Sequence, residues 1–393
     1  MSSAIPSTDI DMFSAESVRN ARRVDDGIRE LASVVRLERE NIVVLGRYEH
    51  VAKGLMDWKA FSSTSRPWHD PKSVRPEILL TDDPPRHTQV RTVIARTLSP
   101  KAMKRIDAFF KREAEALIGS LITQSGDKID AVKDVTARYV HKVLPDLMGL
   151  PLEGRENMTP FGNAVWATMG PKNELFDEAM AGAGNSFEWV DKACNRENIR
   201  PHSLGREMYA AADRGEISQK DAKLLTLTIL SAGADTTVIT MASALNAFAR
   251  FPQQYQILRD DPSLLRNAFD ETLRWDSPSR LAGRIAKQDI QIEDCVIPEG
   301  TRCGLLFATA NRDPRKWVEP RQFDIRRDVK GHLGWGYGIH MCVGKALAQM
   351  EAGALLGEIV KRVERIEPAG EPEPWMTTIG HGPVKVPVRL HAA

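Results

Sequence analysis

The sequence of 393 residues predicts a mainly helical protein with small β-sheets. Residues 223–251 form a long, almost uninterrupted apolar stretch, which has the length and character of a helix buried on nearly all sides. Apolar residues recur at helical spacing over residues 99–150. Short β-branched runs occur near residues 34–45 and 285–307, so we expect one β-rich corner toward each end of the chain.

The elements of the first third follow from local patterns. Residues 1–14 are polar and predict a loose arm, and a helix begins near Ser14 and continues to about Ser33. Two β-branched runs at residues 34–37 and 41–45 predict a hairpin around a polar turn. Residues 48–56 return to a helical pattern, and residues 61–72 predict a long irregular loop, a kind of segment that is often functional.

Further helices are expected along most of the remaining chain. Prolines 84 and 85 precede a helix that carries His87 and Arg91 on one face. Helices are predicted over residues 99–122 and 129–150, and two short ones over residues 159–189, separated by a Gly-Pro break at Gly170.

The long helix over residues 223–251 carries polar residues at its middle. Gly233, Asp235, Thr236 and Thr237 stand where packing needs nothing polar, and threonines can hydrogen-bond back to helix carbonyls and soften a helix. This pattern indicates a wet pocket beside a buried helix. A further helix then carries Glu271 and Arg274, and short strands follow over residues 285–297 and 303–307.

Composition excludes several classes of protein. There are 54 Lys and Arg against 53 Asp and Glu, so the net charge of +1 does not indicate a nucleic-acid partner. Four scattered cysteines without a CxxC pair argue against a disulfide framework or a structural zinc site and fit a reducing cytoplasm. The N-terminus has no signal-like apolar run, and no stretch reaches about 18 uninterrupted apolar residues, so we expect no membrane anchor.

The most informative stretch is residues 331–344, Gly-His-Leu-Gly-Trp-Gly-Tyr-Gly-Ile-His-Met-Cys-Val-Gly. Its five glycines allow tight turns and close approach to a flat partner. Cys342 lies just before a helix N-terminus, where free amides favour a thiolate. Such a thiolate is either a metal ligand or a nucleophile, and His340 nearby could serve a nucleophile as its base.

Three other groups of residues have both an ordinary and a functional interpretation. Glu271 and Arg274 are an ordinary surface ion pair or a structural pair. Asp235 and Thr236 are a defect on a solvent-facing helix or a functional pair, and their apolar flanks favour the second. Four residues would each be assigned to the surface, but together they could donate to two carboxylates of a cofactor: His87, Arg91, Arg284 and His340.

Taken together, these motifs resemble a known family. The run from Trp335 to Gly344, the Glu271-Thr-Leu-Arg274 motif and residues 232–237 are similar, in order and separation, to those of soluble bacterial cytochrome P-450 haem-thiolate monooxygenases. The resemblance covers essentially the whole chain and implies a single domain over residues 1–393, shaped as a triangular prism. The haem would lie between the long central helix and the cysteine loop. Trp335 stands where the family usually has phenylalanine.

The resemblance implies a role for each motif. Cys342 becomes the iron ligand of haem b, with Trp335 and Gly344 beside it. Asp235 and Thr236 become the acid and the alcohol that relay protons to dioxygen. Glu271 and Arg274 become a structural pair, completed by Arg321 or a neighbour. The remaining four residues match positions that hold the haem propionates: His87, Arg91, Arg284 and His340.

The substrate implied by the resemblance is a small aromatic molecule. Several local strings are similar to bacterial enzymes that hydroxylate or O-demethylate para-substituted benzoates, and Ser65 and Arg66 are candidates to hold a carboxylate. Leu227, near which that subgroup places an arginine, is apolar, so a neutral phenol or aryl ether remains an alternative. The segments that line the pocket in this family contain Leu79, Trp166, Phe187, Thr228, Ala232, Leu281 and Ile379.

The resemblance also implies electron-transfer partners. A ferredoxin, reduced by a ferredoxin reductase, would dock where Cys342 is nearest the surface. The alternative function is a haem protein that binds or senses a ligand, or one that uses peroxide without a partner. An acid and alcohol pair favours the monooxygenase, because binding alone needs no proton relay. Candidate basic contacts for the ferredoxin are Arg96, Lys101, Lys104 and Lys345.

Overall fold

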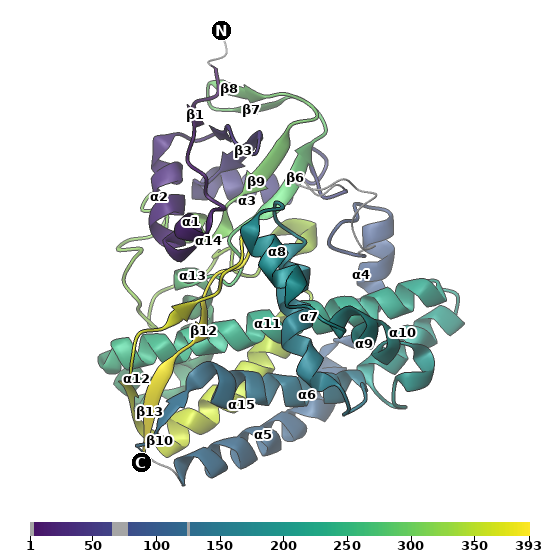
Figure 1. Cartoon of the computed structure of the whole chain (residues 1–393), viewed down its shortest axis with the longest axis vertical. Helices are drawn as coiled ribbons and strands as arrows, with labels where there is room; N and C mark the ends of the chain where they lie inside the picture. Colours follow the sequence, from purple (N-terminus) through teal and green to yellow (C-terminus); the bar gives the residue numbers. More distant parts are fainter. Residues whose placement is uncertain (1–3, 65–77, 124–125) are drawn as a thin grey trace.

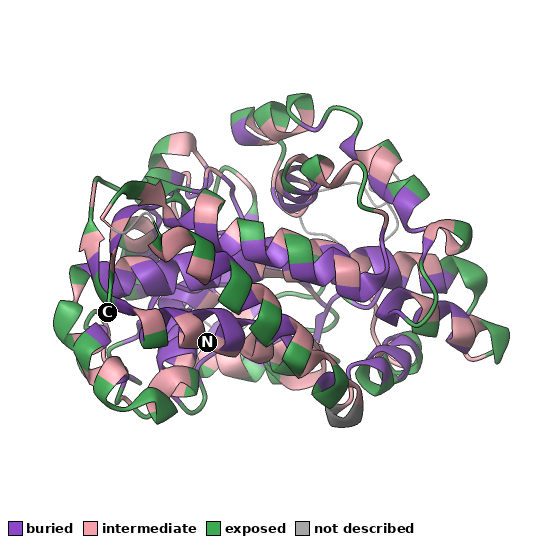
Figure 2. Ribbon diagram, turned by 90° about the horizontal axis from the view of Figure 1, so that it is seen from below, coloured by how far each residue is buried: buried purple, intermediate pink, exposed green. Residues whose placement is uncertain are grey.

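The computed structural model describes residues 4–64, 78–123 and 126–393. Helices make up most of this structure, and strands gather near the N-terminus and beside the C-terminus (Figure 1). Buried residues lie mainly on the inward faces of the helices and exposed residues on the outward faces (Figure 2). The mainly helical class with small sheets is therefore confirmed.

The helices are α1 (Ala15–Arg19), α2 (Ala21–Leu31), α3 (Tyr48–Met56), α4 (Arg86–Thr97), α5 (Pro100–Ile122), the π-helix η1 (Ala131–Ala137), α6 (Arg138–Met148), α7 (Met158–Ala167), α8 (Glu174–Ala181), α9 (Ser186–Ala193), α10 (Leu204–Asp213), α11 (Gln219–Arg250), α12 (Pro252–Asp260), α13 (Leu265–Trp275), α14 (Phe307–Ala310) and α15 (Lys345–Arg362). The strands are β1 (Ser7–Thr8), β2 (Val35–Leu37), β3 (Ile42–Leu45), β4 (Phe61–Ser62), β5 (Lys128–Asp130), β6 (Ala282–Ala286), β7 (Ile290–Ile292), β8 (Cys295–Ile297), β9 (Arg302–Leu305), β10 (Val363–Pro368), β11 (Glu373–Pro374), β12 (Pro383–Lys385) and β13 (Pro387–Ala392).

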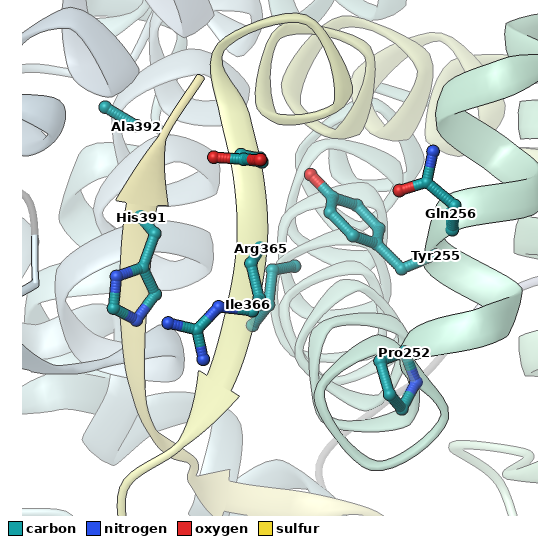
Figure 3. Close-up of a pocket in the computed structure, with 8 residues that line it drawn as sticks. Pro252, Tyr255, Gln256, Arg365, Ile366, His391 and Ala392 are labelled. Atoms are coloured by element: carbon teal, nitrogen blue, oxygen red, sulfur yellow. The ribbon is translucent and has the colours of Figure 1, made fainter.

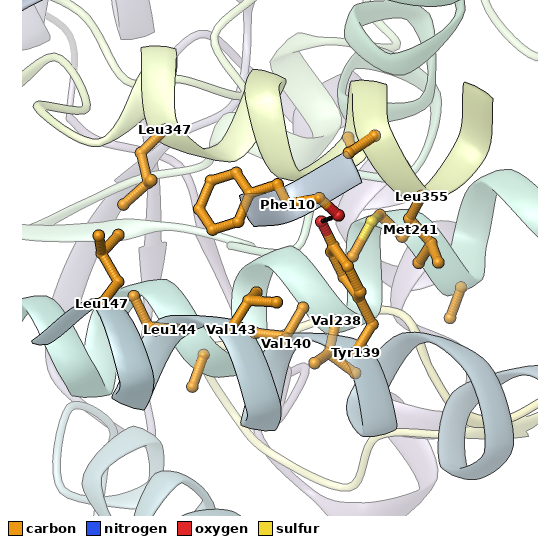
Figure 4. Close-up of a cluster of buried hydrophobic side chains, with 14 of the residues drawn as sticks. Phe110, Tyr139, Val140, Val143, Leu144, Leu147, Val238, Met241, Leu347 and Leu355 are labelled. Carbon is orange, nitrogen blue, oxygen red and sulfur yellow. Dashed lines mark hydrogen bonds between the residues drawn. The ribbon is translucent and has the colours of Figure 1, made fainter. Parts of the chain in front are cut away.

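The central helix is α11, which begins at a capping box. The Ser218 hydroxyl accepts from the amide of Asp221, and the Asp221 carboxylate accepts from the amide of Ser218. The helix packs against α6, α10, α13 and α15. Figure 4 shows the apolar core where α5, α6, α11 and α15 meet. Of the described helices, α11 alone is long and apolar enough to cross a membrane, but 72% of its most apolar window is buried inside the protein, as in a core helix.

The largest sheet has the strand order β1-β2-β3-β9-β6-β4. Strands β2 and β3 form the predicted hairpin, with Val35 opposite Val44 and Leu37 opposite Ile42. The middle of β6 pairs Arg284 with Cys303 of β9. This register buries Arg284 at the edge of the region where the cysteine loop also lies. A second sheet, in the order β10-β13-β5, joins the C-terminus to the start of η1.

Local patterns predicted several elements closely and missed others. The predicted helices over residues 48–56 and 99–122 correspond to α3 and α5. The prediction of a loose arm is wrong for the described residues 4–14, because β1 pairs in parallel with β2 and Met12 and Phe13 are fully buried. The helix predicted over residues 129–150 instead begins as strand β5 and the π-helix η1, because β5 pairs with the distant β13. Residues 159–189 hold three helices rather than two.

Candidate active site

The Cys342 loop, residues 331–344, folds back on itself. The Cys342 amide donates to the Trp335 carbonyl at 2.7 Å. Gly336 and Gly338 have φ values of 69° and 66°, in the left-handed region that glycine adopts without strain. A Cβ at Gly338 would lie 2.4 Å from the Leu55 carbonyl oxygen, so α3 and the loop approach more closely than any side chain would allow.

Burial dominates the electrostatics of Cys342. Burial raises the pKa of the thiol, while the amides of Gly344 and Lys345 and the nearby charges of Arg91 and Lys345 oppose this rise without cancelling it. The amides at the helix N-terminus therefore favour a thiolate as expected, but burial outweighs them in the chain on its own. A thiolate at this position needs a further positive charge, such as a metal ion bound to the sulfur.

His340 is poorly placed to activate a nucleophile. Its Nε2 is hydrogen-bonded to the Ser63 hydroxyl at 3.0 Å, and its ring lies edge-on to His87 with the ring centroids 4.6 Å apart. Burial, together with the nearby charges of Arg284, His87 and Arg91, lowers the pKa of His340 to about 3. These contacts argue against a cysteine nucleophile with His340 as its base.

Arginine and histidine side chains from three elements converge on the same region, and within the described residues none of them has a carboxylate as its hydrogen-bond partner. Arg284 of β6 is almost completely buried, and within the described part of the chain its side chain donates only to the Gly283 carbonyl. Burial lowers the pKa of Arg284 to about 10. The buried Nε2 of His87 has no partner among the described residues. Arg91, also on α4, donates to the Met341 carbonyl at 2.6 Å. The cluster formed by His87, Arg91, Arg284 and His340 is a ready site for carboxylates.

One face of α11 is open although the helix is otherwise buried. Thr228, Ala232 and Thr236 are spaced four apart, so they share this face, and all three retain solvent exposure. The Thr236 hydroxyl donates to the Ala232 carbonyl at 2.7 Å. The predicted bonding of threonine back to the helix is therefore present, and α11 nevertheless runs without a break from Gln219 to Arg250.

Asp235 points away from this open face. Its carboxylate lies against α7, where a Cβ added to Gly162 would be only 1.9 Å from Oδ2. Oδ2 has no hydrogen-bond partner among the described residues. Burial raises the pKa of Asp235 to about 7. The interpretation as a solvent-facing defect is wrong, and the group can carry a proton at neutral pH.

Glu271 and Arg274 form a fully buried pair. Arg274 Nε and Nη2 donate to the two carboxylate oxygens at 2.6 and 2.8 Å, and neither side chain is exposed. A surface pair is therefore excluded. The third partner is Arg327, whose Nε donates to Glu271 at 3.3 Å. Arg321 was predicted for this role, but it contributes its backbone carbonyl to the Trp275 indole instead, because Arg327 reaches Glu271 from the following turn.

Five of the predicted pocket residues lie in or against two apolar clusters. Trp166, Leu281 and Ile379 lie in one cluster, where Trp166 packs on Trp375 with ring centroids 5.2 Å apart. Leu79 is part of the larger core cluster and Phe187 packs against that cluster. Thr228 and Ala232 lie on the open face of α11, and Leu227 is buried. Ser65 and Arg66 lie outside the described residues, as does the side chain of Lys101.

A separate surface pocket of about 480 Å³ holds none of the predicted residues (Figure 3). Its polar groups are already engaged, because His391 and Arg365 both bind Glu367 and the Tyr255 hydroxyl donates to the Val363 carbonyl. It offers no chemistry to a substrate. Its lining residues are Pro252, Tyr255, Gln256, Glu364, Arg365, Ile366, His391 and Ala392.

Several residues around the site were not predicted from the sequence. Ser63 contacts His340, Gly162 makes room for Asp235, and Arg327 completes the Glu271 pair. Gln349 and Asp270 contact each other beneath Trp335. None carries a local signal, except that a glycine inside a helical pattern can indicate close packing.

Comparison with known proteins identifies the family. A sequence model of cytochrome P-450 matches residues 190–388. Cytochrome p450 CYP199A2 of Rhodopseudomonas palustris is 36% identical over 399 residues, which cover 99% of this chain and 95% of that protein. The chain belongs to the cytochrome P-450 family.

Other relatives agree with this assignment. This cytochrome P-450 is 27% identical to the vitamin D(3) 25-hydroxylase of Pseudonocardia autotrophica, over 89% of this chain and 88% of that protein. The solved structure of CYP109Q5 from Chondromyces apiculatus is similar with a TM-score of 0.81 and 27% identity, covering 99% of this chain and all of that one. The resemblance found in the sequence is confirmed, and the protein is a haem-containing monooxygenase.

The residues present fit haem b, the cofactor of this family. The described part of the chain has no group of three or more His, Cys, Asp or Glu side chains that could hold a metal ion. A porphyrin supplies four nitrogen ligands itself and needs one ligand from the protein, which the Cys342 loop can offer. Its two propionates fit the cluster of His87, Arg91, Arg284 and His340, whose donors have no carboxylate partner among the described residues.

Proposed function

We propose that this cytochrome P-450 inserts one oxygen atom from O2 into a small aromatic substrate, with benzoate-like acids favoured. The substrate gains a hydroxyl group while two electrons and two protons reduce the other oxygen atom to water. On an aryl methyl ether the same step leads to a phenol and formaldehyde. The observation that carries the proposal is the open face of α11 beside two apolar clusters rich in aromatic side chains.

Cys342 is the proposed iron ligand, and the four basic residues hold the propionates. When bound, the haem supplies the oxygen-activating chemistry of the family. The Trp335 carbonyl fixes the Cys342 backbone through its amide, and the buried pair of Glu271 and Arg274 holds neighbouring segments in place. Arg274 does this by donating to the carbonyls of Asn311 and Pro320 at 3.0 and 2.9 Å.

Asp235 and Thr236 are proposed as the acid and the alcohol of a proton relay to the open face of α11. Thr236 lies on that face, and the Asp235 carboxyl group must turn away from α7 to reach it. Asp235 is half protonated near neutral pH, because burial raises its pKa to about 7. The Thr236 hydroxyl can accept a proton and pass one on. Replacing Thr236 with Ala is expected to leave electron consumption in place but to lower product formed per electron, which product and peroxide assays measure. Unchanged coupling would remove Thr236 from the relay.

A ferredoxin, reduced by its reductase, is the proposed electron donor, acting in the cytoplasm. Exposed apolar side chains lie near Cys342, namely Met341 in the loop, Tyr337 in the loop and Met56 at the end of α3. Lys345 and Arg91 lie near the same sulfur and add positive charge. An apolar centre with a basic rim suits a small acidic iron-sulfur protein.

The decisive experiment is a substrate panel. Para-substituted benzoates, phenols and aryl ethers are added to the ferric protein, and the shift from the low-spin to the high-spin Soret band is recorded. The proposal expects the largest shifts with small para-substituted aromatics, and with the acids ahead of the neutral compounds. A response only to large aliphatic molecules would overturn the aromatic assignment. A response to phenols and ethers without acids would favour the neutral alternative.

A further inference from the structure

The side chain of Trp335 ties together three elements around the Cys342 loop. Its indole Nε1 donates to Asp270 Oδ1 at 2.9 Å. Asp270 lies on α13, directly before Glu271. Gln349, on the helix that follows Cys342, donates to both oxygens of Asp270 at 3.1 and 3.2 Å. One carboxylate therefore links the Cys342 loop to α13 and to α15.

The same tryptophan controls the backbone of Cys342. The Trp335 carbonyl accepts the Cys342 amide at 2.7 Å, so the anchored residue is also the one that holds the cysteine. The ring is buried and packs on Phe269, with ring centroids 6.1 Å apart. The ammonium of Lys345 lies 5.6 Å from the ring centroid. Any shift of the indole is thereby transmitted to the loop.

Tryptophan can make this link, whereas phenylalanine cannot. A buried indole N–H needs an acceptor, and Asp270 provides one. Phenylalanine could fill the same space but has no donor, so the Asp270 carboxylate would lose a partner. A bond to a charged acceptor is stronger than one between neutral groups, which makes the anchor stiff.

We propose that Asp270 is a positioning residue that holds the Trp335 indole and the Cys342 loop, and that its carboxylate, tempered by the indole N–H, sets the reduction potential of the haem iron. The inference rests on the proposed role of Cys342 as the iron ligand. Reduction adds an electron, and a carboxylate fixed beside the loop opposes that added negative charge. The donors on Trp335 and Gln349 partly neutralise this effect and hold the carboxylate in place.

The test is a set of midpoint potentials measured by spectroelectrochemistry on the full-length holoprotein. Asp270→Asn keeps an acceptor oxygen but removes the charge, so the potential is expected to shift to more positive values. Gln349→Leu leaves the carboxylate less neutralised, so the potential is expected to shift to more negative values. Asp213→Asn, which removes an exposed carboxylate of α10 that binds Arg196, controls for the loss of one charge and should leave the potential unchanged.

The link through the ring is tested by a double-mutant cycle with Trp335→Phe. The indole N–H partly neutralises the carboxylate, so the shift caused by Asp270→Asn is expected to be larger in the Trp335→Phe background. Equal shifts in both backgrounds, or unchanged potentials throughout, would overturn the inference. Should Trp335→Phe fail to fold, the opposite signs expected for Asp270→Asn and Gln349→Leu still decide the case.

The carbon monoxide spectrum separates this inference from the proposed function. All variants are expected to keep the long-wavelength Soret band of a thiolate-ligated ferrous complex. Absence of that band from active wild-type protein would overturn Cys342 as the ligand. Its presence together with unaltered potentials would overturn only the role of Asp270.

Discussion

Glu351 is a buried carboxyl group whose effect on stability can be measured directly. It lies on α15 between Leu347 and Leu355, which share its helix face and belong to the apolar core of Figure 4. Its Oε1 has no hydrogen-bond partner among the described residues. Burial raises the pKa of Glu351 from 4.5 to about 8.

The sign of the effect follows from the two protonation states. Between the ordinary pKa and the raised one, the unfolded chain releases a proton that the folded protein keeps, so the free energy of unfolding falls as pH rises. One pKa unit corresponds to about 1.4 kcal/mol, so Glu351 is expected to cost the wild type ~3 kcal/mol between about pH 5.5 and 8.

Replacing Glu351 with Gln removes the titration and keeps the size of the side chain. The free energy of unfolding from urea titrations is measured for both proteins across this pH range, with haem content held equal. The difference between them is expected to grow in favour of Glu351→Gln by ~3 kcal/mol as pH rises. Glu216→Gln is the control, because the side chain of Arg96 lowers the pKa of Glu216 to about 2 and its difference should stay constant. Parallel curves for wild type and Glu351→Gln would refute the reasoning.

Two further predictions concern the walls of the site. Gly162→Ala is expected to lower the amount of product formed per electron and to lower the free energy of unfolding by ~1–3 kcal/mol, because the added methyl group displaces the Asp235 carboxylate. The control is Gly353→Ala, whose methyl group meets no atom within 4 Å and should lower neither quantity. Arg274→Lys is expected to lower the free energy of unfolding by ~3 kcal/mol or more, because lysine cannot make the buried two-pronged contact with Glu271. The control is Arg365→Lys, at an exposed ion pair, which should change the free energy of unfolding by no more than ~1 kcal/mol. Urea titration and coupling assays measure both, and a fully coupled Gly162→Ala enzyme or equal costs for the two arginine changes would contradict them.

The sequence predicted those features that depend on short-range pattern. Helix α5 has strong apolar periodicity and a proline at its start, so the sequence predicts a helix over residues 99–122, and the structure has it at Pro100–Ile122. Strand β5 was read as helix, because its three residues take their conformation from pairing with β13, more than two hundred residues away. No window of local sequence contains that information.

The residues of the site also differ in whether the local sequence predicts them. Cys342, Asp235 and Thr236 could be chosen because chemistry demands those residue types in a recognisable setting. Arg327 could not be chosen over Arg321, because the decision depends on which side of a loop faces Glu271. Residues whose role is to support another side chain carry a signal only in three dimensions.

Two kinds of buried polar group lack hydrogen-bond partners in the described part of the chain. Donors of arginine and histidine lie in one region and carboxyl groups lie in others, and each kind is accommodated in a different way. Within the described residues, Arg284 and the Nε2 of His87 have no carboxylate partner, and buried donors of this kind are costly unless a bound group supplies the missing acceptors. Asp235 Oδ2 and Glu351 Oε1 have no hydrogen-bond partner in the same part of the chain, and burial raises the pKa of each enough to hold a proton near neutral pH. The cluster of His87, Arg91, Arg284 and His340 thus has room for acceptors beyond the described residues, whereas the acids relieve their own burial by protonation. The propionates of haem b can supply these acceptors, and the protonation of Asp235 near neutral pH supports its proposed role in the relay.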